Sequence, residues 1–140
     1  MKPVVLLDTG PLVAAINRRD RHHAWARLQL AELSPPLLSC EAVLAEACFL
    51  LRAAPGGADA VLDLVRRGVI ELSFHAGDHV VPIARLMKKY ADMPMSFADA
   101  CLVRMSEIHA DSRTFTIDKD FRQYRRHGRQ VIPLLVPTGI

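Results

Sequence analysis

The chain begins with a short apolar run, Val4 to Leu7, that stops at an aspartate. A continuous apolar run bounded by turn-forming residues is typical of a β-strand buried on both faces. Gly10 and Pro11 follow, and proline is favoured in the first turn of a helix. Asp8 is therefore expected at the carboxyl end of a parallel strand, the edge where open α/β sheets bind ligands. Loop and cap aspartates are also common at such positions, so the other acids decide its role.

Strand and helix patterns alternate along the rest of the chain. Strands are expected at 37–39, 69–74, 114–117 and 131–136, and helices at 12–16, 22–33, 40–52, 58–67, 78–90 and 96–108, with a helical turn at 121–124. This alternation predicts a mainly parallel sheet with helices on both faces, in one α/β domain spanning residues 1–140. The apolar stripes of the helices predict that Leu28, Leu50 and Val81 face the core.

The cysteines indicate a reducing compartment. There are three, Cys40, Cys48 and Cys101, without a CxxC pair. Cys40 and Cys48 fall on or near one predicted helix, roughly 12 Å apart at about 1.5 Å per residue, which is too far for a disulfide. We expect a cytoplasmic protein with free thiols. Neither a signal peptide nor a membrane-spanning apolar stretch is recognisable, so no membrane association is expected.

Two basic clusters suit an anionic partner, although the net charge is only +3. Either cluster alone could equally be a solvated surface. The first contains Arg18, Arg19 and Arg21, and the second contains Arg122, Arg125, Arg126 and Arg129.

Glu46 is the acid that local structure explains least. It lies at the border of the apolar stripe of its predicted helix, and no Lys or Arg stands three or four residues away. A carboxylate buried without a partner costs several kcal/mol or takes up a proton. Glu46 is therefore expected to face a cleft or a cation, with an edge position in solvent as the alternative.

Two further acids occupy recognisable local positions. Asp99 stands three residues after Ser96, which is the spacing of a capping box, so a helix cap is one explanation. Asp118 ends a predicted strand, as Asp8 does. If these acids meet Glu46 at one sheet edge, the resulting group of carboxylates favours a hard cation, Mg²⁺ or Mn²⁺, over zinc. Such sites serve phosphoryl transfer. No Walker lysine loop, GxSxG elbow or GxGxxG motif offers a different chemistry.

With the acids placed, the chain resembles the PIN-domain nucleases, and more narrowly the VapC-type toxins of bacterial toxin–antitoxin pairs. The matching stretches are 6–12, 41–47, 96–100 and 116–121, in the family's order. The resemblance implies a three-layer α/β/α fold and Mg²⁺- or Mn²⁺-dependent cleavage of RNA that leaves a 5′-phosphate. The residues matching the family's acidic positions are Asp8, Glu46, Asp99 and Asp118. Asp120 is an auxiliary acid that could take the place of Asp118, and Thr116 is an auxiliary hydroxyl.

The expected function is therefore a metal-dependent endoribonuclease. The resemblance further implies a homodimer held silent by a small antitoxin protein, and the two basic clusters are expected to hold RNA. One alternative is a PIN-like domain without useful activity that binds RNA or protein. A nuclease of the same chemistry directed at DNA is a lesser alternative.

Overall fold

Five short parallel strands form the central sheet of the computed structural model, which describes residues 3–140. In sheet order they are β3 (Ile70–Leu72), β2 (Leu37–Ser39), β1 (Val4–Leu7), β4 (Ser112–Phe115) and β7 (Leu134–Leu135). β1 lies at the centre and pairs with β4 from Val4 opposite Ser112 to Leu7 opposite Phe115. A separate antiparallel ribbon consists of β5 (Arg125–Arg126) and β6 (Gln130–Val131).

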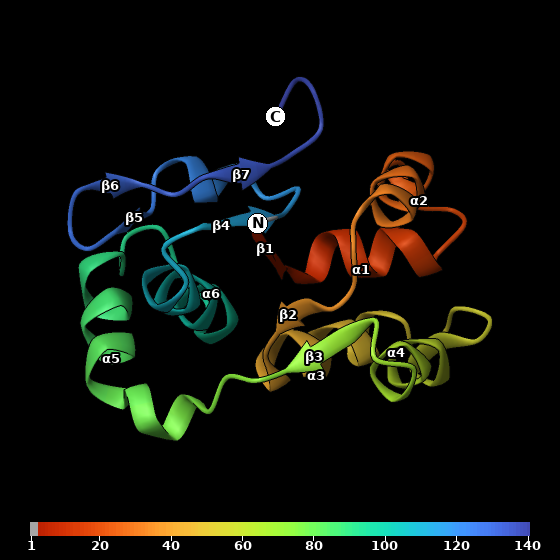
Figure 1. The fold of residues 1–140 in the computed structure, drawn as a ribbon, viewed down its shortest axis with the longest axis horizontal. Helices are drawn as coiled ribbons and strands as arrows, with labels where there is room; N and C mark the ends of the chain where they lie inside the picture. The colour runs from red at the N-terminus through yellow and green to blue at the C-terminus, as the bar shows by residue number, and fades with distance from the viewer. Residues whose placement is uncertain (1–2) are drawn as a thin grey trace.

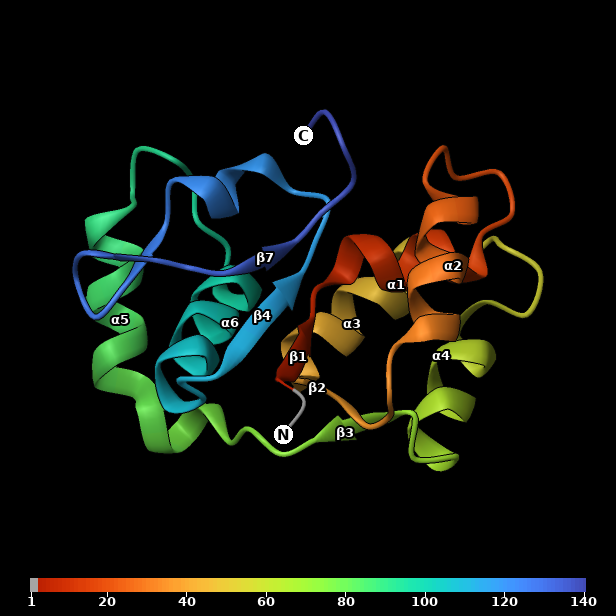
Figure 2. The same ribbon diagram turned by 45° about the horizontal axis from the view of Figure 1, so that its top comes forward.

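Helices cover both faces of the sheet, as Figures 1 and 2 show. The first two crossovers carry α1 (Thr9–Ile16), α2 (His23–Glu32), α3 (Glu41–Leu50) and α4 (Gly57–Arg66). The third contains the 3₁₀-helix η1 (Ala76–His79), α5 (Val80–Lys89) and α6 (Phe97–Ile108), and η2 (Lys119–Arg122) follows β4. Because crossovers are right-handed and the third runs back across the sheet, α5 and α6 lie on the opposite face from α1, α2 and α4 (Figure 1). The predicted three-layer α/β/α fold is confirmed.

The core explains why the first strand is continuously apolar. Val5, Leu6 and Leu7 are buried between the helical layers, and every residue from Ala100 to Val103 on α6 is 0% exposed. On the other face of the sheet, Trp25 of α2 packs edge-on against Phe115 of β4, with ring centroids 5.3 Å apart. β1 is therefore fixed from both sides, and so is the residue that follows it.

Several predicted boundaries and faces are wrong. Leu28, Leu50 and Val81 are 56%, 58% and 60% exposed, so they do not face the core. Ala26 of α2 is buried instead, because it packs with the alanines of α1, where small side chains let the helices approach closely.

The C-terminal strands also differ from the prediction. β4 begins and ends two residues earlier than expected. The segment predicted as one strand at 131–136 is divided into β6 and β7 around Pro133, which has no N–H to donate to a ladder.

Two expectations from the sequence concern the thiols and the membrane. Cys40, Cys48 and Cys101 are free thiols. Within residues 3–140, no helix has the length and apolar character needed to cross a bilayer.

Candidate active site

Six carboxylates line one cleft of about 540 Å³ at the carboxyl edge of β1 and β4. Parallel pairing of β1 with β4 brings the ends of these strands together, although they are more than 100 residues apart in sequence. Two helices that cross this edge, α3 and α6, contribute further acids. The loop after α1 contributes one more, so the six are Asp8, Asp20, Glu46, Asp99, Asp118 and Asp120.

Asp8 is the most buried acid of the cleft, at 5% exposure. Its Oδ1 accepts a hydrogen bond from the N–H of Thr9 and its Oδ2 accepts one from the hydroxyl of Thr116, both at 2.7 Å. The pKa of Asp8 is raised from 3.8 to about 7. Burial is the largest cause and the negative charges of Asp99 and Asp118 add to it, while the hydrogen bonds from Thr116 and Thr9 lower the pKa. Asp8 does cap α1, but a cap alone does not require burial beside other carboxylates.

Gly10 allows the close approach that builds this side of the cleft. A Cβ atom at this position would lie 2.5 Å from Cγ1 of Ile117. The first turn of α1 therefore packs directly against the segment after β4, which places Thr116 beside Asp8.

Glu46 is held by a residue that the sequence analysis did not single out. The hydroxyl of the buried Thr9 donates to Oε2 of Glu46 at 2.9 Å. Glu46 is exposed, as the solvent-facing alternative predicted, but it also lines the cleft. The position of Thr9 directly after Asp8 was the available signal, because neighbouring residues at a strand end reach the same cleft.

Asp99 combines a capping position with a place in the cleft. The Ser96 hydroxyl caps α6 by accepting from the N–H of Asp99 at 3.0 Å. The hydroxyl of Tyr124 donates to Oδ2 of Asp99 at 2.9 Å. Burial raises the pKa of Asp99, the bond from Tyr124 lowers it, and the charge of Asp118 raises it. Asp99 therefore belongs to the cap of α6 and also to the group of carboxylates, the two roles that the sequence suggested.

Asp118 and Asp120 both reach the cleft, so the choice of the fourth acid stays open. Oδ1 of Asp118 caps η2 by accepting from the N–H of Asp120 at 2.9 Å, and the N–H of Asp118 donates to Oγ1 of Thr116 at 2.9 Å. The negative charge of Asp118 contributes to the raised pKa of Asp8 and of Asp99. Asp118 is thus electrostatically coupled to both.

Tyr124 is the second residue of the site that the sequence analysis missed. It is 0% exposed, and burial together with the charge of Asp99 raises the pKa of its hydroxyl. The hydroxyl therefore stays protonated and donates to the acid. Its sequence surroundings carry no signal for this role, because the contact joins residues 25 positions apart.

The acids that line the cleft offer carboxylate oxygens as metal ligands, and such ligands suit a hard divalent cation. No group of three or more His, Cys, Asp or Glu side chains within residues 3–140 is arranged to hold a metal ion. Mg²⁺ is commonly bound through one or two carboxylates, with water and substrate phosphates as its remaining ligands. Asp8 and Asp99, whose charges interact, fit this pattern.

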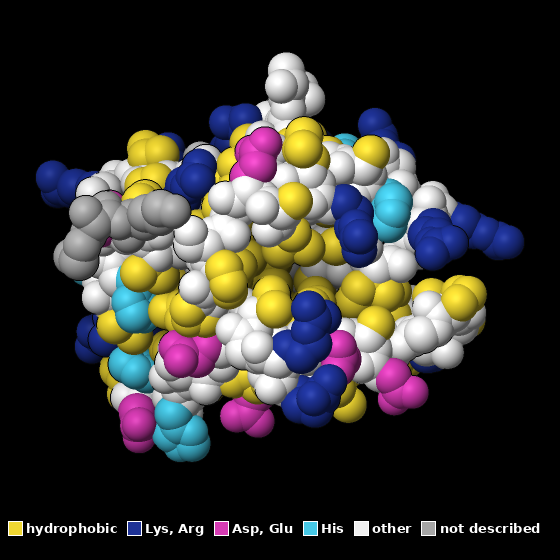
Figure 3. Space-filling view, turned by 45° about the vertical axis from the view of Figure 1, so that its right-hand side comes forward, with side chains coloured by type: hydrophobic (Ala, Val, Ile, Leu, Met, Phe, Trp, Pro, Cys, Tyr) yellow, Lys and Arg dark blue, Asp and Glu magenta, His cyan; other side chains and the backbone are white. Residues whose placement is uncertain are grey.

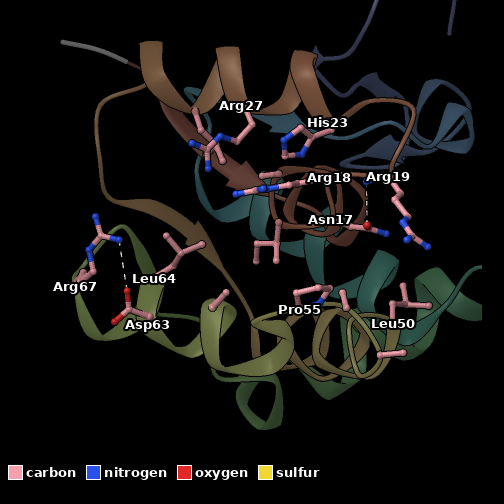
Figure 4. Close-up of a pocket in the computed structure, with 16 residues that line it drawn as sticks. Asn17, Arg18, Arg19, His23, Arg27, Leu50, Pro55, Asp63, Leu64 and Arg67 are labelled. Carbon is pink, nitrogen blue, oxygen red and sulfur yellow. Dashed lines mark hydrogen bonds and ion pairs between the residues drawn. The ribbon is translucent and has the colours of Figure 1, made fainter.

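A larger groove of about 1210 Å³ adjoins the cleft, with Leu50 lining both. Figure 3 shows the face with this hollow, which has hydrophobic side chains at its bottom and Lys or Arg at its borders. In Figure 4, residues of the α1–α2 region form one wall and those of the α3–α4 region the other. Its basic residues are Arg18, Arg19, His23, Arg27 and Arg67.

Arg126 is a correction to the predicted basic clusters. Its side chain is 4% exposed, and its guanidinium donates to the backbone oxygens of Ser106 and Ala110 at 3.0 and 3.1 Å. These are carbonyl groups at and beyond the end of α6, where a cation complements the helix dipole. Arg126 therefore anchors the C-terminal ribbon and does not belong to an exposed RNA-binding surface.

A parallel sheet between helical layers, with carboxylates gathered at its carboxyl edge, defines a class of α/β proteins with an acidic cleft. Within this class the chain belongs to the PIN domain family, whose sequence model matches residues 5–127. The fold is similar to that of VapC20 from Mycobacterium tuberculosis, described as a sarcin-ricin loop cleaving toxin, with a TM-score of 0.74 and 21% identity. That match covers 83% of this chain and 91% of VapC20. A search of curated proteins found no match.

Proposed function

We propose that this protein is a Mg²⁺- or Mn²⁺-dependent endoribonuclease and the toxin of a type II toxin–antitoxin pair. The observation that carries the proposal is the gathering of carboxylates from five separate segments in one cleft. A buried acid with a pKa of about 7 beside other acids is unfavourable in itself. Membership in the PIN domain family and the fold shared with VapC20 support the same function.

Asp8 and Asp99 are proposed to hold the cation, with Glu46 and Asp118 completing the acidic site. When bound, the ion would polarise the scissile phosphate and lower the pKa of a water. Thr116 and Thr9 orient Asp8 and Glu46 through their hydroxyls. The chain thus contributes fixed carboxylate positions, while Asp120 remains a second candidate for the role of Asp118.

The exposed arginines are proposed to hold RNA by its phosphates. The loop that carries Arg18, Arg19 and Arg21 also contains Asp20, which lines the acidic cleft. The exposed Arg122 and the half-buried Arg125 follow Asp118 through η2, so both groups come close in sequence after acids that line the cleft. Phosphate contacts position a nucleic acid, whereas base contacts specify it.

The groove is proposed to receive the small antitoxin. Its apolar floor and arginine borders suit a segment with apolar and acidic side chains. Because Leu50 lines both hollows, the same segment can reach the acids and place an arginine among them, where a planar guanidinium can bond two carboxylate oxygens. Such a partner would cover Arg18 and Arg19 as well, so RNA and antitoxin would compete.

The deciding experiment is incubation of structured cellular RNA with the purified protein in Mg²⁺ and in EDTA. The wild type should cleave RNA in Mg²⁺ alone and leave 5′-phosphates, whereas Asp8→Asn should not cleave. Asp59→Asn is the matched control, because Asp59 is an exposed acid of α4 outside both hollows. RNA binding without cleavage would favour the binding-module alternative, and cleavage of DNA alone would favour a DNA-directed enzyme.

A further inference from the structure

The ring of Tyr124 is fixed on two sides by other aromatic rings. Tyr90 and Phe121 each pack edge-on against it with ring centroids 5.1 Å apart. The hydroxyl of Tyr90 accepts a hydrogen bond from the N–H of Arg125 at 2.9 Å, which ties the backbone after Tyr124 to α5 and its C-terminal end. The Tyr124 hydroxyl consequently has one orientation, directed at Oδ2 of Asp99.

We propose that Tyr124 is a positioning residue that fixes the carboxylate of Asp99 for the metal ion. This inference rests on the proposed function of the same cleft. The Tyr124 hydroxyl occupies one lone pair of Oδ2, so the plane of the carboxylate is set and Oδ1 is left for other ligands. Thr116 has the equivalent relationship to Oδ2 of Asp8.

The two hydroxyls differ in how they are held. Thr116 lies in the segment directly after β4, on the same sheet edge as Asp8. Asp99 sits on α6, across the cleft, and its partner comes from the turn after η2. Tyr124 therefore joins the helix carrying one acid to the segment carrying Asp118 and Asp120, and fixes their spacing. Outer hydrogen-bond partners of this kind orient metal ligands, and their loss typically weakens binding about 10- to 100-fold.

The test is Tyr124→Phe, which keeps the ring and removes the hydroxyl. Calorimetric titration with Mg²⁺ in the absence of RNA should give a dissociation constant about tenfold weaker than that of the wild type. Asp59→Asn is the control, because Asp59 is an exposed acid of α4 outside both hollows, and it should leave the constant unchanged. Equal Mg²⁺ affinity in Tyr124→Phe and wild type would overturn the inference.

A second measurement uses the wild-type protein, so it does not depend on a variant that folds correctly. The chain contains two tyrosines, so labelling with ¹³C at Cζ gives two NMR signals, one from Tyr90 and one from Tyr124. Mg²⁺ should shift the Tyr124 signal and leave that of Tyr90 in place. A Tyr124 signal that does not respond while Mg²⁺ binds would refute the positioning role alone. Absence of Mg²⁺ binding by the wild type would instead refute the proposed function.

Discussion

The hydroxyl of Thr116 donates a 2.7 Å hydrogen bond to Asp8, although the two residues are 108 positions apart in the chain. The same oxygen accepts from the N–H of Asp118, so Thr116 joins two acids of the cleft. Since Thr116 is 0% exposed, water cannot replace it in either bond. The ionised form of Asp8 therefore depends on this contact.

Thr116→Val should destabilise the metal-free protein more at pH 8 than at pH 5. The bond lowers the pKa of Asp8, so its loss moves that pKa above the wild-type value of about 7. At pH 5 Asp8 is protonated in both proteins. At pH 8 the wild type stabilises the ionised carboxylate with the hydrogen bond from Thr116, and the variant lacks that bond. A hydrogen bond to a charged group contributes about 1.5–3 kcal/mol. Urea unfolding at the two pH values measures the difference, and Thr116→Ser, which keeps the hydroxyl, should restore wild-type behaviour.

Neutralising Arg18, Arg19 and Arg21 together should weaken binding of all RNAs alike. The log–log salt dependence should become shallower by roughly 0.7 per lost phosphate contact on single-stranded RNA. Filter binding at several salt concentrations gives the slope. The substitutions are made in the Asp8→Asn protein so that the RNA is not cut during the measurement. Arg85→Gln, an exposed arginine of α5 outside both hollows, should change nothing. If the same substitutions in a protein that keeps Asp8 moved cleavage to new sites while the slope stayed unchanged, these arginines would be reading sequence.

An antitoxin should co-purify from the native host, and reversing charge at the groove should release it. Arg27→Glu with Arg67→Glu places negative charge on opposite walls of the groove (Figure 4). Acidic groups of a bound segment would then be repelled, so less of the smaller chain should be recovered by affinity purification of a tagged protein. Arg85→Glu is the control. Recovery of the wild type alone, at native abundance and without harm to growth, would contradict the proposal.

The protein is expected to be a homodimer. Apolar helix residues that a monomer leaves more than half exposed include Phe49, Leu62, Val80 and Val81. Exposed apolar area of this kind favours association, and a two-fold dimer is the commonest form. Light scattering at micromolar concentration should give twice the 15.5 kDa of one chain. A monomeric mass would contradict the expectation.

The first three strands could be located because their signals are local, whereas β4 was predicted two residues late and β6 and β7 were predicted as one strand. An apolar run that ends on an acid identified β1, and strand alternation with helices was enough for the parallel sheet. Asp8, Glu46, Asp99 and Asp118 were identified as a set, and they do line one cleft. In contrast, Tyr124 acts through a bond to a residue 25 positions away, which leaves no local pattern. Thr9 was indicated only by its place beside Asp8, since its bond partner lies 37 positions away. Arg126 was misread because basic residues cluster in sequence whether they are exposed or cap a buried helix end.

Asp8→Asn should remove cleavage and the response to metal without lowering the stability of the metal-free protein. The pKa of Asp8 is about 7 in the folded state and 3.8 unfolded, so the native state binds more protons between these values. Stability conferred by protonated Asp8 is complete below pH 3.8 and is lost as pH rises through 7. Over the interval between the two pKa values, the free energy of unfolding falls by about 1.4 kcal/mol per pH unit, which amounts to at most roughly 4 kcal/mol.

The asparagine is neutral at every pH and avoids this loss, so the variant should equal or exceed the wild type at pH 8 in EDTA and lose its advantage near pH 4. Mg²⁺ should stabilise only the wild type, by about 2.7 kcal/mol at one hundred times the dissociation constant. Unfolding of both proteins across this pH range, with Asp59→Asn as control, measures these differences. If Asp8→Asn is clearly less stable than the metal-free wild type at pH 8, then Asp8 is mainly a helix cap. The raised pKa would then reflect burial alone, and the case for a cation among these acids would lose its first member.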